Sequence, residues 1–277
     1  MENSREMKSG IPQIEASAIA QGPWWRDRSG ELLGLMEGRD AAFVYETGVA
    51  RAAVRRLQDL RSVARVFYAI KANDHPDLLR TLAAEGCGFE CVSWSEVEYV
   101  RETVPGVEND DLLFTPNFAA RSEYESALDS GIRLTVDNAW VIQNWPGLFQ
   151  GQSLFLRLDL EAGYGHHKKV VTAGADSKFG ISLDDVDSVL EILASQGATV
   201  SGLHTHTGSG VTDAAVWKEQ LDRFVEVLDR FPDARILDLG GGLGVPDHPE
   251  KPVFDLARLD GLLEGSLGGQ GREREAV

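Results

Sequence analysis

The stretch VFYAIKAN, from Val66 to Asn73, joins an apolar, β-prone run to a single lysine, and the pattern breaks at Asp74. The run predicts a buried strand that presents Lys71 at its carboxyl end. An amine held there, partly desolvated, can lose its proton near neutral pH and form a Schiff base with an aldehyde cofactor or a carbonyl substrate. A lysine that follows a strand is more often a solvated loop residue, so the chemical interpretation depends on how the other strands end.

The overall composition limits the class of protein. The 277 residues are 43% hydrophobic and carry a formal net charge of -17. Such a chain can bury a sizeable core in one large α/β domain or two modest ones. Its negative field repels polyanions, which argues against nucleic acid and anionic membranes as partners. No apolar run approaches the roughly 18 residues that a membrane span needs.

The two cysteines, Cys87 and Cys91, lie on either side of a predicted strand start. Two half-buried thiols are favoured over a zinc site, because the pair is closely spaced and no second pair is present. The low cysteine content and the lack of a secretory signal pattern predict a reducing, cytoplasmic compartment.

Strands and helices alternate along the chain, which predicts a parallel sheet covered by helices. About seven strand-helix units follow from the Lys71 strand onward, one short of a closed barrel. The predicted fold class is therefore α/β, a TIM-type (β/α)8 barrel that is incomplete at its last strand. The predicted strands are residues 41–45, 66–70, 88–92, 112–115, 132–136, 154–158, 200–204 and 235–239.

Local signals mark where several helices begin and end. Ser93 with Glu96 has the spacing of a capping box. Ser122 is predicted to cap the helix that Gly131 ends, and Ser182 to cap a later helix.

Three parts are predicted along the chain. Residues 1–38 mix charge, glycine and tryptophan without a sustained period and form an N-terminal leader. Residues 39–260 form the barrel domain, and residues 261–277 form an irregular, glycine-rich tail. Within the barrel, residues 161–178 form a loop that is long enough to be functional.

Polar side chains follow the apolar runs at the strand ends, where barrels of this kind carry their reactive residues. The glycine run after strand 235–239 leaves bare backbone N–H groups that can wrap a phosphate, and a tight turn alone would need fewer glycines. Gly208, Ser209 and Gly210 form a second donor loop. The residues at the strand ends are Lys71, Glu90, Asn117, Asp137, Arg157, His204, His206, Gly240, Gly241, Gly242 and Gly244.

His204 and His206 are two residues apart on one strand and therefore point to the same side. One imidazole is predicted to lie flat on a cofactor ring or to hydrogen-bond to it. An ordinary structural pair is the second interpretation. A metal site ranks last, because its further ligands could come only from His166 and His167 of the long loop, and no metal is predicted.

Four ordered motifs give the chain a specific resemblance to a known family. They are Tyr68 to Asn73, Gly88 to Ser93, His206 to Gly210 and Leu237 to Gly242, and the resemblance covers roughly residues 41–260. In order and spacing they resemble the alanine-racemase-like pyridoxal phosphate decarboxylases, the ornithine, arginine and diaminopimelate decarboxylase group. Within this group, Asn117 and residues 165–169 and 177–180 look most like diaminopimelate decarboxylases, particularly those fused to an aspartate kinase.

The resemblance implies pyridoxal 5'-phosphate as the cofactor and a role for each matched residue. Lys71 would carry the cofactor as a Schiff base, and His206 would stack on the pyridine face. The ring would accept the electron pair that remains when carbon dioxide leaves, while the protein supplies position and electrostatics. The other cofactor-binding residues would be Ser209, Gly240, Gly241 and Gly242 at the phosphate, with Glu90 and Arg157 at the remaining edges.

The last part of the chain departs from the family's pattern. The family places a carboxylate at the pyridine nitrogen and then a phosphate-binding arginine, which only Gly271, Arg272 and Glu273 faintly resemble. The family's C-terminal β-domain is also not found. The resemblance thus implies the N-terminal barrel part of a diaminopimelate decarboxylase-like lyase of lysine biosynthesis, acting on a small amino acid. We expect it to be inactive alone or completed by a homodimer or a partner chain. The alternative is a non-catalytic barrel protein that binds pyridoxal phosphate.

Overall fold

The computed structural model describes residues 24–160, 178–246, 248, 253–267 and 275–276. The chain separates into two compact units, residues 1–49 and residues 50–277. In the first unit, α2 (Trp24–Asp27) and α3 (Ser29–Leu35) are short helices within the predicted leader.

Residues 41–45 form no strand, so that prediction is wrong. Their aromatic and β-branched side chains suit a strand, but a strand also needs a neighbour to pair with. Among the described residues of the first unit no strand forms, and the ring of Phe43 is 92% exposed.

A single parallel sheet organises the second unit. Its order is β1-β2-β3-β4-β5-β7-β8-β9, and β6 pairs with β5 outside this path. Every pair of strands is parallel. The strands are β1 (Phe67–Ala69), β2 (Gly88–Cys91), β3 (Leu112–Phe114), β4 (Arg133–Val136), β5 (Ser153–Asp159), β6 (Ile181–Ser182), β7 (Thr199–His204), β8 (Ile236–Asp238) and β9 (Glu275–Ala276).

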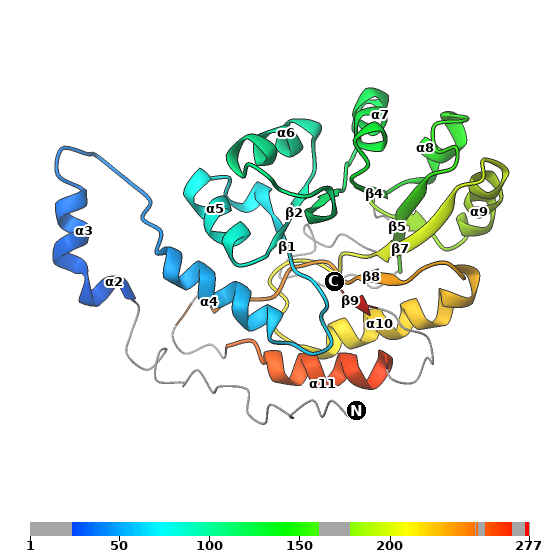
Figure 1. The fold of residues 1–277 in the computed structure, drawn as a ribbon. Helices are drawn as coiled ribbons and strands as arrows, with labels where there is room; N and C mark the ends of the chain where they lie inside the picture. Colours follow the sequence, from blue (N-terminus) through cyan, green and yellow to red (C-terminus); the bar gives the residue numbers. More distant parts are fainter. Residues whose placement is uncertain (1–23, 161–177, 247, 249–252, 268–274, 277) are drawn as a thin grey trace, which may run out of the picture. The chain divides into compact units, whose positions relative to one another are not determined.

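Helices connect the strands and cover the outer side of the curled sheet (Figure 1). This arrangement confirms the predicted class, part of a TIM-type α/β barrel, in which β1 and β9 are the two ends of the sheet. The helices are α4 (Thr47–Gln58), α5 (Pro76–Ala84), α6 (Trp94–Thr103), α7 (Arg121–Ser130), α8 (Ala139–Asn144), α9 (Val186–Ser195), α10 (Ala215–Val227) and α11 (Leu256–Leu267).

The predicted irregular tail contains regular structure. Helix α11 continues past Gly261 to Leu267, because Leu259 and Leu263 are spaced to face the core and are buried. Strand β9 then pairs with β8 in the place where no eighth strand was predicted. Gly261 and Gly265 were misleading because a helix that is fixed by packing tolerates glycine at a modest cost.

One of the three predicted helix caps has the expected form. The Ser93 hydroxyl accepts a hydrogen bond from Glu96 N at 3.3 Å, and Gly131 ends α7 in the left-handed conformation. The predictions for Ser122 and Ser182 are wrong: Ser122 lies inside α7, and Ser182 ends β6. Serines near a helix start also form local turns, so the pattern marks a boundary only approximately.

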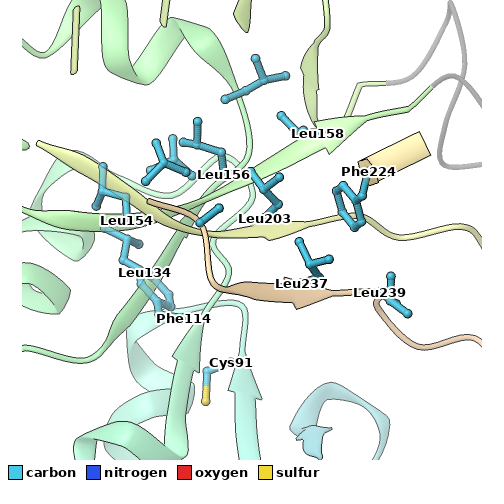
Figure 2. Packing of buried hydrophobic residues seen from close by; sticks show 14 of the residues in the cluster. Cys91, Phe114, Leu134, Leu154, Leu156, Leu158, Leu203, Phe224, Leu237 and Leu239 are labelled. Atoms are coloured by element: carbon cyan, nitrogen blue, oxygen red, sulfur yellow. The ribbon is translucent and has the colours of Figure 1, made fainter. Parts of the chain in front are cut away.

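Leucines from neighbouring strands pack against the surrounding helices (Figure 2). Leu156, Leu203 and Leu237 are register partners across β5, β7 and β8, and each is fully buried. The next residue of each strand points to the opposite face, as the alternation of a strand requires. Arg157, His204 and Asp238, also in register, therefore face the interior of the curled sheet.

Candidate active site

A cavity of about 630 Å³ opens at the carboxyl ends of the strands in the second unit. Its lining includes every residue that the sequence predicts for the cofactor site, together with Asn117 and His204. Asp137, which follows β4, is fully buried and does not line the cavity. The histidines 166 and 167 lie outside the described residues. The predicted cofactor-site residues are Lys71, Glu90, Arg157, His206, Ser209, Gly240, Gly241 and Gly242.

Lys71 lies in a short 3-10 helix, Ile70–Ala72, that directly follows β1. Its Nζ is 3.2 Å from Oε2 of Glu90 on the neighbouring strand β2. The Lys71 side chain is 56% exposed, whereas that of Glu90 is 16% exposed. Burial raises the pKa of Glu90, and the nearby Lys71 charge opposes this rise. The pair therefore places an exposed amine against a carboxyl group that retains a proton more readily than usual.

Arg157 is the buried cation of the site. Its guanidinium lies 4.9 Å from the centre of the Phe179 ring, and Nη1 donates to Oδ1 of Asn117 at 3.4 Å. Burial lowers the pKa of Arg157, while the carboxyl groups of Asp137 and Glu90 raise it. The aromatic face and the surrounding acids together hold the positive charge against the cavity wall.

Both histidines of the pair lie at the cavity as neutral rings. Burial and then the positive charges of Arg157 and Lys71 lower the pKa of His206 to about 4. The same influences hold the pKa of His204 well below its ordinary value. A neutral, flat ring is suited to stacking. Among the described residues no group of three or more histidines, cysteines or acids is placed to hold a metal ion.

Two glycine-containing loops pack so closely that they form one wall of the cavity. Val211 N donates to Gly242 O at 2.9 Å, and Gly244 N donates to Val211 O at 2.7 Å. A Cβ atom at Gly240 would lie 2.5 Å from Thr205 O. Part of the glycine run therefore serves the contact between the loops, a role that was not predicted from the sequence.

The remaining features of this wall fit a phosphate group. In the hydrogen bonds of the described chain, the backbone N–H groups of Gly241 and Gly242 have no acceptor. Ser209 is exposed and adds a hydroxyl to the lining. Bare N–H groups and a hydroxyl are donors that a phosphate uses.

These features suit a barrel that holds a phosphorylated aldehyde cofactor beside a lysine. Residues 48–271 match the family model of pyridoxal-dependent decarboxylases, pyridoxal binding domain. The chain belongs to this family, and its cofactor is pyridoxal phosphate.

Curated relatives include diaminopimelate decarboxylases from several organisms. That of Methanothermobacter thermautotrophicus is 30% identical over 220 residues, which cover 76% of this chain and 51% of the relative. That of Deinococcus radiodurans is 31% identical over 200 residues, which cover 72% of this chain and 52% of the relative. The chain thus spans about half the length of the curated relatives that it matches.

Solved structures confirm the fold. Diaminopimelate decarboxylase from Helicobacter pylori, complexed with L-lysine, matches with a TM-score of 0.74 at 20% identity, over 88% of this chain and 64% of that protein. Lysine/ornithine decarboxylase from Vibrio vulnificus, complexed with putrescine, matches with a TM-score of 0.74 at 24% identity, over 90% of this chain and 66% of that protein. None of the helices in the described ranges is long and apolar enough to cross a membrane.

The sequence placed Phe179 in a family-like motif but predicted no role for it; its ring lies over Arg157 and lines the cavity. The available signal was Gly180, which adopts a φ of +85 and where a Cβ atom would lie 2.7 Å from Asp159 N. A close backbone approach of this kind brings the neighbouring residue to the strand end.

Proposed function

We propose that this chain is the cofactor-binding part of a pyridoxal phosphate-dependent decarboxylase that acts on meso-diaminopimelate in lysine biosynthesis. The observation that carries the proposal is the contact of Lys71 Nζ with Glu90 Oε2, 3.2 Å, in a cavity walled by two phosphate-compatible loops. The names of the curated relatives support the choice of substrate.

Lys71 forms the covalent bond to the cofactor, and Glu90 removes the proton that Lys71 must lose first. An amine must lose a proton before it can bond to an aldehyde. Oε2 of Glu90 is within hydrogen-bonding distance of Nζ and can take that proton, because burial raises the pKa of this carboxyl group. Glu90 also holds the amine toward the cavity.

His206 and Arg157 define the sides of the ring site. The neutral His206 imidazole can lie against an aromatic ring without adding a positive charge. Arg157 adds a fixed positive charge that Phe179 and Asn117 hold in place. Both side chains bind and orient the ring rather than react with it.

Ser209 and the N–H groups of Gly241 and Gly242 bind the phosphate and so fix the distance from the phosphate to Lys71. When bound, pyridoxal phosphate supplies an electron-accepting ring for the electrons released by decarboxylation. The protein positions the cofactor, passes a proton between Lys71 and Glu90, and partly excludes water from the site.

The test is the release of labelled carbon dioxide from meso-diaminopimelate, lysine, ornithine and arginine in separate assays with pyridoxal phosphate. We expect the chain alone to release carbon dioxide no faster than free pyridoxal phosphate does. In the homodimer or with a completing partner chain we expect saturable release from meso-diaminopimelate that disappears in Lys71→Ala. Cofactor binding without release from any of the four amino acids in either form would favour the alternative function, a non-catalytic pyridoxal phosphate-binding protein.

We also propose that the protein works in the cytoplasm and with a second polypeptide, as a homodimer or with a partner chain. The thiols of Cys87 and Cys91 are free and buried, which suits a reducing compartment. The exposed ring of Phe118, beside the cavity-lining Asn117, suits a contact surface. Analytical ultracentrifugation of the purified protein tests the assembly, and a monomer at all concentrations would contradict the homodimer.

A further inference from the structure

We propose that Asp238 is a positioning residue for the phosphate site, because its carboxylate holds the glycine loop in the shape that leaves Gly241 and Gly242 N–H available to an anion. The inference rests on the proposed function, since it takes this anion to be the phosphate of pyridoxal phosphate.

Asp238 is the last residue of β8 and is 8% exposed. Its Oδ1 accepts a hydrogen bond from Gly240 N at 2.8 Å. The side chain thus reaches forward along its own chain and fixes the first peptide of the glycine run. A buried carboxylate that accepts a backbone N–H in this way restrains a loop strongly.

The backbone of Asp238 holds the second loop as well. Its carbonyl oxygen accepts from Thr205 N at 2.9 Å, just after β7 ends. Both donor loops are therefore tied to Asp238 at their starts, and the contacts of Val211 with Gly242 and Gly244 tie them together further along. An apolar substitution at Asp238 keeps the backbone bond to Thr205 but removes the side-chain bond to Gly240, the contact on which the shape of the glycine loop depends.

The backbone N–H groups of the three glycines have different roles. Gly240 N–H is used by Asp238, whereas Gly241 N–H and Gly242 N–H have no acceptor in the described part of the chain. Gly240 therefore anchors the loop and the next two residues carry the donors. Successive N–H groups of this kind form a concave site for an anion once the loop shape is fixed.

A negative charge on Asp238 would repel a nearby phosphate unless a proton neutralised it or a neighbouring donor or cation stabilised it. Burial raises the pKa of Asp238 to about 7, and the bond from Gly240 N–H and the charge of Arg157 act in the opposite direction. The nearby carboxylate of Glu90 also raises the pKa of Asp238. The charge of Asp238 is therefore either neutralised by a proton or engaged by Gly240 and Arg157, which limits its repulsion of the phosphate.

The experiment compares pyridoxal phosphate with pyridoxal, which has the same aldehyde and ring but no phosphate. Absorbance titrations give the ratio of the two dissociation constants for each variant. We expect Asp238→Leu to lower this preference for the phosphorylated ligand about tenfold or more, because loss of the loop shape weakens charge-assisted hydrogen bonds. Asp238→Asn retains an oxygen acceptor for Gly240 N–H and should retain most of the preference.

Asp260→Asn is the matched control. Asp260 is a buried acid whose Oδ1 also accepts a backbone N–H, that of Ser62, but it lies on α11 and does not line the cavity. We expect this variant to leave the preference unchanged. A merely structural role for Asp238 would lower the melting temperature of Asp238→Leu with an unchanged preference, and this result would overturn the inference.

Amide hydrogen exchange in the wild-type chain tests the same point without a substitution. Gly240 N–H should be protected before any ligand is added, and the N–H groups of Gly241 and Gly242 should become protected when pyridoxal phosphate or inorganic phosphate is added. Equal, rapid exchange of all three amides before ligand addition would overturn the inference. A wild-type chain that binds pyridoxal phosphate no tighter than pyridoxal would instead refute the proposed phosphate site itself, and with it the role of Asp238.

Discussion

Gly242 lies so close to Gly208 that a Cβ atom at position 242 would be 1.8 Å from the Gly208 carbonyl oxygen. Gly241, one residue earlier, has no atom within 4 Å of the corresponding position. Two adjacent glycines thus meet different requirements. Gly242 allows two loops to touch, whereas Gly241 keeps one side of the cavity free of a side chain.

This difference predicts that one alanine substitution lowers stability and the other weakens cofactor binding. Gly242→Ala should lower the free energy of unfolding by about 2 kcal/mol or more, because the new methyl group collides with backbone and the φ of +95 disfavours a side chain. Gly241→Ala should leave the free energy of unfolding nearly unchanged but weaken binding of pyridoxal phosphate. Urea denaturation and absorbance titration measure the two effects. If Gly241→Ala bound pyridoxal phosphate as well as the wild type, the phosphate would not lie against this residue.

A second prediction concerns the attachment of the cofactor. Borohydride reduction of the protein with pyridoxal phosphate should fix the cofactor on Lys71, which peptide mass spectrometry locates. Lys71→Ala should show neither the visible absorbance band nor the adduct, because Lys71 is the lysine that lines the cavity among the described residues.

Lys178 provides a matched control for this experiment. Its Nζ lies 5.0 Å from the centre of the Phe179 ring, close to the site, but it does not line the cavity. Lys178→Ala should retain the adduct on Lys71. A reducible adduct that persists in Lys71→Ala would show that another amine carries the cofactor.

The convergence of the site could be predicted from the sequence because it follows from topology. Once strands and helices alternate, the carboxyl ends of parallel strands meet at one edge, and residues as distant as Lys71 and Gly242 must line the same cavity. The motif order then identified the chemistry. No knowledge of side-chain positions was needed for this step.

Contacts that depend on packing could not be predicted in this way. The stacking of Phe179 on Arg157 joins a loop to β5, and nothing in the spacing of the two residues indicates it. The helix at residues 256–267 was not predicted, because its glycines indicate an irregular segment although its leucine spacing indicates a helix. The prediction for residues 41–45 was wrong for the opposite reason, since their composition favours a strand but the described residues of their unit offer no neighbouring strand.

A third prediction separates the two histidines. Loss of His206 should weaken binding of pyridoxal phosphate about tenfold, the amount expected for a lost ring stack, whereas loss of His204 should have a smaller effect. His206→Ala and His204→Ala are compared by absorbance titration. His206→Phe retains a flat ring and should restore most of the affinity lost in His206→Ala. Equal, small effects of the two alanine variants would favour a structural pair.

The last prediction concerns the contact between α11 and the segment before β1. Asp260 Oδ1 accepts from Ser62 N at 2.9 Å and from the Ser62 hydroxyl at 2.7 Å, and the Asp260 side chain is almost fully buried. Burial alone would raise the pKa of Asp260, but the hydrogen bonds from Ser62 and the charge of Arg61 outweigh it and lower the pKa. The ionised form is therefore favoured more in the folded than in the unfolded chain.

A carboxyl group with a lowered pKa in the folded state stabilises the protein above its unfolded pKa, about 4, and this contribution disappears as the pH falls through the lower, folded pKa. Asp260→Asn should lower the free energy of unfolding by about 1–3 kcal/mol at pH 7, because it removes a charged acceptor from two buried donors. Urea denaturation at pH 7, 5 and 3.5 measures the difference from the wild type, which should be constant between pH 7 and 5 and shrink at pH 3.5. Ser62→Ala, which retains the backbone donor, should show a smaller loss with the same pH dependence. A difference that grew as the pH fell would mean that Asp260 is protonated in the folded chain and that its contact with Ser62 does not depend on its charge.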